Sequence, residues 1–212
     1  MEFRRTGPSR LFALGVAQVA VPGEKASGDL HVVQPFPDGM LVAAIDGVGH
    51  GKDAAAAAEL AAATLRRHAQ ESVVSLVRRC HRALAGTRGV VLSVASFNVA
   101  EDTMTWIGIG NVEGVLIRAD AETEEPNETI LLLRGGIVGL ELPLLKASVV
   151  SLLPRDLLIF STDGVRNEFV PEVDTSRDPQ RLADRILARH ARGTDDGLVL
   201  VARYLRARTG RS

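Results

Sequence analysis

Features that would point to a secreted, disulfide-linked or membrane-spanning protein are scarce in this chain of 212 residues. Cys80 is its one cysteine, which excludes an intrachain disulfide and fits a reducing compartment. The longest apolar run, residues 54–65, is mostly alanine and contains Glu59, so it is too short and too weakly hydrophobic to cross a bilayer. No apolar stretch with a cleavage site follows the first residues, so no signal peptide is expected. These absences predict a cytoplasmic protein without membrane partners.

Strong charge of either sign is also missing. The formal net charge is −1, which gives no broad attraction to nucleic acid or to an anionic membrane, and neither is expected as a partner. Hydrophobic residues make up 46% of the chain, and we find no linker and no repeat. This length and composition suffice for one core, so a single domain over residues 1–212 is expected.

The hydrophobic pattern changes its period along the chain. A continuously apolar run at residues 40–46 predicts a strand buried on both faces. An alanine-rich segment at residues 52–70 and an apolar stripe at residues 72–85 predict two helices. Short β-branched runs then predict strands at residues 90–100, 103–109 and 114–118, arranged as an antiparallel meander with hairpin turns at residues 101–102 and 110–111.

The order of elements favours a layered fold. Asp178 and Pro179 predict the start of a helix over residues 180–192. The acidic segment at residues 120–128 is expected to be an exposed loop. Because helices and strands do not alternate regularly, we expect an α+β sandwich with antiparallel sheets inside and helices outside. Other strands are expected at residues 11–21, 129–133, 147–152, 156–162 and 198–204.

Acidic residues mark the ends of several predicted strands. Asp46 ends one apolar run and opens the sequence DGVGHG at residues 46–51. Asp163 ends another run, and Asp195 and Asp196 precede the last strand. Each motif alone could be an ordinary turn, because Asp-Gly turns are common. Taken together, the motifs indicate more. Proteins hold hard cations with carboxylates that come from different strands and meet at one end of a core.

A glycine-rich turn between a strand and a helix also raises the possibility of a nucleotide-binding loop. The P-loop requires Ser or Thr after Gly-Lys, but Asp53 follows Lys52. The dinucleotide-binding fingerprint requires a third glycine at the position of Lys52. Both patterns therefore fail.

The ordered motifs resemble the PP2C-like metal-dependent protein phosphatases, and most closely their bacterial SpoIIE-type branch. That branch shows an S-G-D motif, present here at residues 27–29, followed by D-G-x-G-H-G, present at residues 46–51. It later shows a P-x-D stretch ending in T-D-G, present at residues 154–164, and a D-D pair, present at residues 195–196. The resemblance covers roughly residues 11–205. It implies a four-layer α-β-β-α sandwich with two central antiparallel sheets.

The resemblance also implies a centre with two Mn²⁺ or Mg²⁺ ions. By motif position Asp46 would bridge the ions, Gly47 would offer its backbone carbonyl, and Asp163 and Asp195 would complete the shell of one ion. Oxygen ligands without a Cys/His cluster suit these hard cations. The full set of candidate ligands is Asp29, Asp46, Gly47, Asp163, Asp195 and Asp196, and the choice between the last two is open.

The same resemblance implies a catalytic role for Asp46 and Asp163 through a metal-bound water that attacks phosphorus. His50 belongs to the glycine-rich motif, and its role stays open between an acid–base group and a support for the turn. Cysteine phosphatases carry an arginine six residues after the catalytic cysteine, in the pattern C-x₅-R. Cys80 does not fit this pattern, because the residue at that position is Gly86.

Two departures from the family pattern keep a second function open. The family usually has Thr two residues after the D-D pair, where this chain has Leu198. A clear equivalent of the phosphate-binding arginine of eukaryotic members is also missing. The chain could therefore be an active Ser/Thr phosphatase or an inactive binding module that kept the fold.

The expected partners come from the branch. A catalytic domain of this size is similar to stressosome feedback phosphatases, which implies phosphorylated STAS-domain proteins of a stressosome or partner-switching module as substrates. An anti-anti-sigma factor is the alternative substrate. The segment between Asp163 and Gln180 leaves directly from a candidate ligand, so we expect it to be the docking surface. Its candidate docking residues are Arg166, Asn167, Phe169 and Val170.

Overall fold

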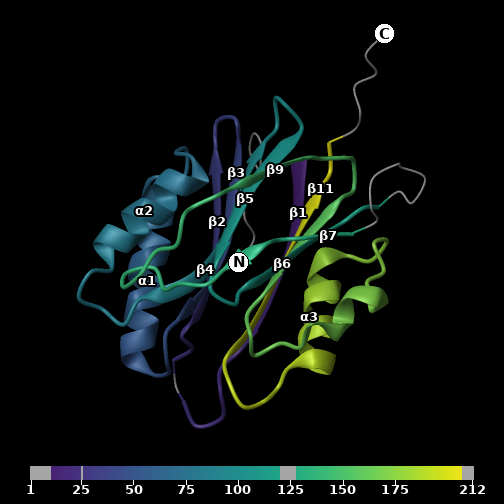
Figure 1. Ribbon diagram of the computed structural model, residues 1–212. Helices are drawn as coiled ribbons and strands as arrows, with labels where there is room; N and C mark the ends of the chain where they lie inside the picture. The colour runs from purple at the N-terminus through teal and green to yellow at the C-terminus, as the bar shows by residue number, and fades with distance from the viewer. Residues whose placement is uncertain (1–10, 25, 120–127, 207–212) are drawn as a thin grey trace.

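Two β-sheets lie face to face between two layers of helices. The computed structural model describes residues 11–24, 26–119 and 128–206. Helices α1 (Lys52–Arg67) and α2 (Val73–Ala83) cover one sheet, and α3 (Pro179–His190) covers the other (Figure 1). The predicted four-layer α-β-β-α sandwich is confirmed. None of the helices within these ranges is long and apolar enough to cross a membrane.

The first sheet lies under α1 and α2. Its strand order is β2-β3-β4-β5-β8, and β9 also pairs with β5. All pairs are antiparallel except β5–β8, which is parallel. Its strands are β2 (Asp29–Phe36), β3 (Gly39–Gly47), β4 (Val90–Asn98), β5 (Thr103–Ile109), β8 (Leu133–Arg134) and β9 (Ser148–Ser151).

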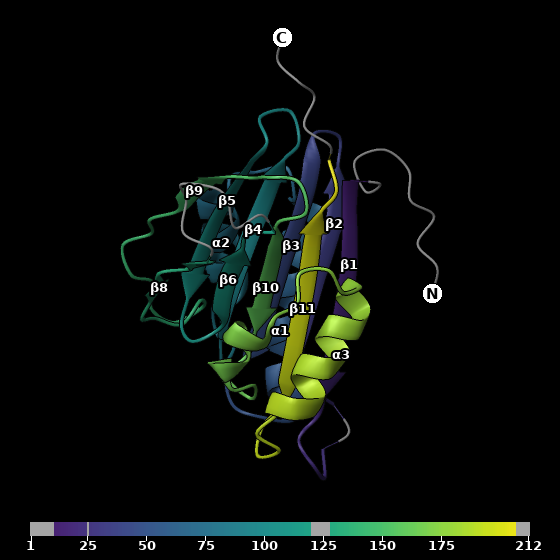
Figure 2. The ribbon, with the colours of Figure 1, turned by 90° about the vertical axis from the view of Figure 1, so that its right-hand side faces the viewer.

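The second sheet lies under α3 and has the order β1-β11-β10-β6-β7, antiparallel throughout. A short 3₁₀-helix, η2 (Asn167–Glu172), precedes α3 (Figure 2). The strands of this sheet are β1 (Phe12–Val19), β6 (Glu113–Ile117), β7 (Glu128–Ile130), β10 (Leu157–Ser161) and β11 (Gly197–Tyr204).

Three hydrophobic clusters fill the spaces between the layers, with one under α1 and α2, one between the sheets and one under α3. Alanine forms most of the buried face of α1, which lets this helix lie close to the sheet. The predicted helix starts are confirmed, because Ser72 caps α2 and Asp178 caps α3 through backbone amides. As predicted, β3 is buried almost throughout its length.

Strand β2 was not predicted from the sequence. This strand contains His31, Gln34 and Pro35, which break the apolar alternation on which the prediction depended. It lies at the edge of the first sheet, where a proline is tolerated because an edge strand has one side without a partner strand.

The predicted meander was wrong beyond its second strand. β4 and β5 form a hairpin, but β6 crosses to the second sheet and pairs with β10 and β7. Gly110 and Asn111 therefore form a crossing between sheets and not a hairpin turn. The predicted acidic loop at residues 120–128 lies outside the described residues except for Glu128, which begins β7.

Candidate metal centre

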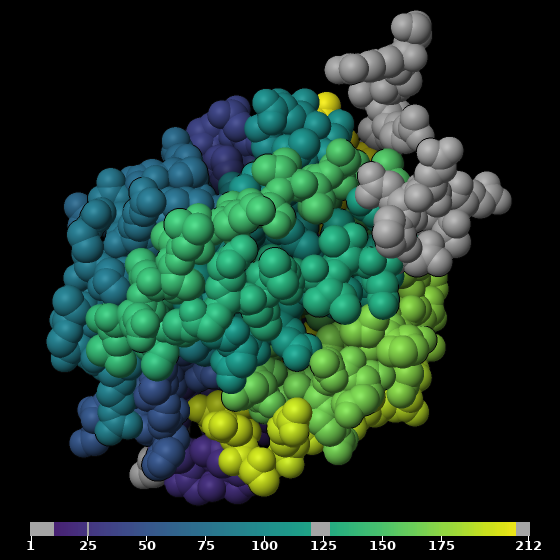
Figure 3. All heavy atoms as spheres, viewed as in Figure 1, coloured from purple at the N-terminus to yellow at the C-terminus, as the bar shows by residue number. Residues whose placement is uncertain are grey.

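Separate strands bring the acidic motifs to one end of the sandwich. Asp46 lies at the end of β3, Asp163 follows β10, and Asp195 precedes β11. β10 and β11 are antiparallel neighbours in which Ser161 pairs with Val199, so the residues after one strand lie beside those before the other. In Figure 3 the yellow segment before β11 meets the purple segment after β1 at the lower edge of the molecule.

Asp46, Asp163 and Asp195 line a common cavity of about 500 Å³. Its walls come from the glycine-rich turn after β3, the crossing between β5 and β6, and the segment before β9. Three of the predicted metal ligands, together with His50, thus share one cavity. The other described lining residues are Val21, Val48, Gly49, His50, Val91, Gly110, Asn111, Gly135, Ile137 and Thr194.

Asp29 lies behind this cavity and not on its wall. Its side chain is 1% exposed, and its position on β2 pairs with Asp46 on β3. The Thr162 hydroxyl donates to Asp29 Oδ2 at 2.7 Å and accepts the Leu198 N–H at 2.8 Å. Asp29 therefore joins the first sheet to the two strands of the second sheet that carry the later motifs.

The two adjacent acids before β11 have different surroundings. The Asp196 carboxylate is buried and accepts the backbone N–H groups of Val21 and Gly28, at 2.7 and 2.5 Å. Asp195 is exposed on the cavity wall, and its Oδ1 accepts the Asp196 N–H at 2.9 Å. Asp195 therefore lines the cavity, whereas Asp196 holds the loop between β1 and β2.

Two partners of Asp163 were not predicted from the sequence. The Asn111 side-chain amide donates to Asp163 Oδ2 at 2.6 Å, and Arg192 Nε donates to the Asp163 carbonyl oxygen at 2.8 Å. Gly110 and Asn111 have the composition of an ordinary turn. Only the pairing of β6 with β10 brings Asn111 to Asp163, and no local pattern in the sequence carries that information.

His50 lies at the mouth of the cavity. Its side chain is 74% exposed, and Nδ1 lies 3.3 Å from Glu24 Oε1. This contact joins the glycine-rich turn to the loop that follows β1. Its exposure leaves the imidazole accessible from solvent, so the structure is compatible with either role considered for it.

The segment expected to dock a partner is only partly exposed. Arg166 and Asn167 are exposed, but Phe169 is 2% exposed and packs edge-on against the His190 ring, with centroids 6.1 Å apart. The expectation that Phe169 is an exposed apolar contact was wrong, because η2 turns this ring toward α3.

The carboxylates at this end of the protein repel one another. Burial, followed by the charges of the neighbouring aspartates, raises the pKa of Asp46 from 3.8 to about 8. Burial is also the main cause that raises the pKa of Asp29 to about 7 and the pKa of Asp163 above its ordinary value. The described residues that line the cavity include neither Lys nor Arg. A cation in the cavity would relieve this repulsion.

The donor set fits Mg²⁺ or Mn²⁺ with water completing the coordination. In the part of the chain that the structure describes, no three Asp, Glu, His or Cys side chains are gathered closely enough to hold an ion by themselves. The three lining carboxylates instead surround a space that is large enough for ions and water. Mg²⁺ dehydrates reluctantly and is usually held by one or two carboxylates together with several waters. The residues present therefore fit hydrated hard cations and not a closed zinc site.

Two glycines permit the close approach of elements that carry the acids. A Cβ at Gly47 would collide with the Ala54 backbone of α1. A Cβ at Gly164 would collide with the Asp196 carbonyl oxygen. These contacts fix the turn after Asp46 against α1 and the turn after Asp163 against the residues before β11.

Gly164→Ala should therefore destabilise the protein and separate Asp163 from Asp195. We expect the free energy of unfolding to fall by about 1–3 kcal/mol, the usual cost of overpacking. Gly135→Ala is the matched control, because Gly135 also lines the cavity but has open space where a Cβ would lie. Urea unfolding of both variants measures the difference, and equal stability would contradict the close approach at Gly164.

The raised pKa values give the metal-free protein a pH-dependent stability. A carboxyl group whose pKa is raised on folding stabilises the fold below its unfolded pKa, and this contribution is lost as pH rises through the folded pKa. For Asp46 this window runs from pH 3.8 to about 8. The free energy of unfolding of the metal-free protein should fall as pH rises across this window. The decrease should be smaller in Asp46→Asn than in the unmodified protein, and added Mn²⁺ should restore stability at the alkaline end. Urea unfolding at a series of pH values checks this, and a flat profile would contradict it.

Comparison with known proteins gives consistent relatives. The family model of the Stage II sporulation protein E (SpoIIE) matches residues 37–209. Phosphoserine phosphatase RsbX of Bacillus subtilis (strain 168) is 26% identical over 111 residues, which are 52% of this chain and 56% of RsbX. The aligned region thus spans about half the length of that curated relative.

Solved structures show the same fold over most of the chain. A protein of the bacterial stressosome, a modular system adapted to control secondary messenger signalling, superposes with a TM-score of 0.83 at 28% identity, covering 91% of this chain and 99% of that one. RsbX in complex with magnesium gives a TM-score of 0.80 at 20% identity, covering 91% and 94%. The PP2C phosphatase domain of SpoIIE from Bacillus subtilis gives 0.72 at 18% identity, covering 91% and 62%. The predicted resemblance is confirmed: this chain belongs to the SpoIIE family, whose domains have the PP2C-type fold.

Proposed function

We propose that this chain is a cytoplasmic, metal-dependent Ser/Thr protein phosphatase that uses two Mn²⁺ or Mg²⁺ ions. The observation that carries the proposal is the meeting of Asp46, Asp163 and Asp195 in one cavity with neither Lys nor Arg among its described lining residues. Three carboxylates alone would repel a phosphomonoester. Cations between the carboxylates and the phosphate reverse the sign of that interaction.

In this proposal Asp46 would hold both ions with the Gly47 carbonyl, and Asp163 and Asp195 would complete one shell. When bound, the ions supply Lewis acidity for the attack of water on phosphorus and neutralise charge on the phosphoryl group. Asn111 fixes the orientation of the Asp163 carboxylate, since its amide donates to Oδ2.

Two buried carboxylates would act as supports for the ligands. Asp29 keeps β2 against the Thr162 hydroxyl, next to Asp163. Asp196 binds the backbone amides of Val21 and Gly28, next to Asp195. Both were candidate ligands by sequence, and their burial and hydrogen bonds favour a positioning role.

The position of Leu198 favours an enzyme over an inactive binding module. Its side chain is fully buried in the cluster between the sheets and is not among the residues that line the cavity. Its backbone N–H supports Thr162. The replacement of the family's Thr therefore removes no side chain from the cavity.

The substrates we propose are phosphorylated STAS-domain proteins of a stressosome. The likeness to RsbX and to the stressosome relative supports this choice. A phosphorylated anti-anti-sigma factor of a partner-switching module remains the alternative. Comparing kcat/KM for purified phosphoproteins of the two classes would decide between them.

Turnover of p-nitrophenyl phosphate should require added Mn²⁺ or Mg²⁺ and should stop with EDTA. Asp46→Asn and Asp163→Asn should each lower kcat/KM more than about 100-fold, because even residues that only orient ligands cost about 10–100-fold. Asp38→Asn is the control, since Asp38 is exposed in the turn at the opposite end of β3. Full activity in a metal-free preparation would reject the proposal, and failure to bind Mn²⁺ in a calorimetric titration would favour the inactive module.

Asn111→Ala should raise the Mn²⁺ concentration that gives half-maximal activity by about 10–100-fold, as is usual when a partner of a metal ligand is removed. Part of the activity should return at saturating Mn²⁺, because the ligands themselves remain. Asn98→Ala is the control: this asparagine caps a turn at the far end of β4. An unchanged Mn²⁺ requirement in Asn111→Ala would show that the hydrogen bond to Asp163 does not hold the ligand.

A further inference from the structure

We propose that a groove beside the candidate metal centre docks a substrate segment carrying apolar and basic residues near its phosphorylated side chain. The inference rests on the proposed phosphatase function and deepens it, because it states the local chemistry that the phosphoprotein must present. The groove lies between β6, β7 and β10 on one side and η2 on the other, and has a volume of about 360 Å³.

The groove exists because α3 covers only part of the second sheet. Helix α3 packs on β1 and β11, while β10 and β6 extend beyond it (Figure 2), and β7 lies next to β6 at the edge of the sheet. Val115 and Ile159 form an apolar floor, and Ile130 pairs with Val115 in the neighbouring strand. Ile130 is 70% exposed although it lies on the same face as the floor. Val115 and Ile159 are themselves 5% and 1% exposed, so Ile130 offers the apolar surface that a side chain placed in the groove would cover.

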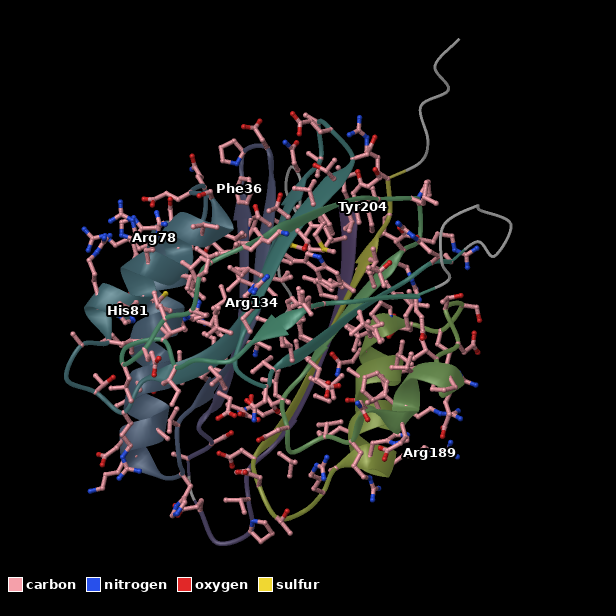
Figure 4. All side chains as sticks on the ribbon, in the orientation of Figure 1. Phe36, Arg78, His81, Arg134, Arg189 and Tyr204 are labelled. Atoms are coloured by element: carbon pink, nitrogen blue, oxygen red, sulfur yellow. The ribbon has the colours of Figure 1, made fainter. Side chains whose placement is uncertain are left out.

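Carboxylates surround this apolar floor. Glu113 lies on β6, Glu128 on β7 and Glu168 on η2, and all three line the groove. Its described lining residues include neither Lys nor Arg. Arg189, labelled on α3 in Figure 4, donates to Glu172 at 2.9 Å and is not among the lining residues. The acidic rim is therefore complementary to Lys or Arg on a bound segment.

The groove opens beside the cavity of the metal centre. Glu113 on β6 pairs with Ser161 on β10. Asn111 lies two residues before Glu113, Asp163 lies two residues after Ser161, and these two side chains are hydrogen-bonded to each other. Two residues of extended chain span about 7 Å, and the five residues of β6 span about 16 Å. When a phosphoserine lies at the metal centre, the substrate residues about two to six positions from it in sequence would therefore lie in the groove. This continuity favours a segment of the substrate over an unrelated ligand.

The groove also explains how the expected docking segment contributes despite the burial of Phe169. This ring forms part of the wall, and Val170 and Pro171 continue it. The Asn167 side chain reaches across to Glu113 Oε1 at 3.3 Å, which fixes η2 relative to β6. The segment after Asp163 thus shapes one side of the site, and β6 and β7 provide the other.

Two synthetic phosphoserine peptides of equal length test the proposal. One carries Leu and Arg at two to six residues from the phosphoserine, and the other carries Gly and Asp at the same positions. With Mn²⁺ present, we expect kcat/KM to be at least roughly tenfold higher for the first peptide, the effect of one interface contact of ordinary strength. The ratio should decrease with salt, because charges at an exposed rim are screened over about 8 Å at physiological ionic strength.

Two groove variants make the test specific. Ile130→Asp, and Glu128→Lys combined with Glu168→Lys, should each reduce the preference roughly tenfold, again the size of one contact, and leave p-nitrophenyl phosphate turnover unchanged. The matched controls are Val149→Asp, at a 66% exposed apolar position on β9, and Glu101→Lys, at an exposed glutamate in the β4–β5 turn. If Ile130→Asp does not fold, the charge-reversal variant carries the test alone.

The outcomes separate this inference from the function on which it rests. Turnover of p-nitrophenyl phosphate with equal kcat/KM for both peptides would overturn the groove and leave the phosphatase intact. A preference that persists unchanged in both groove variants would also overturn it. Absence of turnover for every substrate in the presence of Mn²⁺ would overturn the phosphatase assignment and the groove together.

Discussion

Repulsion between carboxylates at one end of the sandwich is the constraint on which the rest of this structure depends. Asp46 lies at the end of β3 and Asp163 follows β10, strands whose other residues build the cores, so the same packing that stabilises the fold also forces these charges together. Asp46 is held by strand pairing, and Asp163 is held by its hydrogen bonds to Asn111 and Arg192. The unfavourable charge therefore remains in the folded protein as a local affinity for cations.

The protein holds this arrangement through buried polar contacts that join separate elements. The Thr162 hydroxyl connects Asp29 on β2 with the backbone of β11, and Asp196 connects β11 with the loop between β1 and β2. Asp29, Thr162 and Asp196 are buried, so water competes little for their hydrogen bonds. Loss of one partner would leave a buried polar group unsatisfied, which costs more than the bond itself contributes.

The sequence allowed good prediction of elements whose signal is local. Continuous apolar runs identified β3, β10 and β11, the apolar stripe identified α2, and the capping residue Asp178 with Pro179 identified the start of α3. The edge strand β2 and the crossing of β6 could not be predicted, because edge strands tolerate polar residues and strand pairing is a property of the whole sheet. For the same reason the acids could be recognised as a group, but Asn111 and the different surroundings of Asp195 and Asp196 could not.

The pairing of β1 with β11 has a consequence for how the protein folds. Phe12 pairs with Tyr204, so this sheet closes only when segments from the two ends of the chain meet. Such long-range closure carries a large entropic cost before any contact offsets it, and it is associated with slow folding. A partly folded chain could already form the turn after Asp46, yet it would lack the residues before β11. Binding of a divalent cation would therefore require that both sheets have formed. A cation present during refolding would stabilise the folded state and would not accelerate the early folding steps.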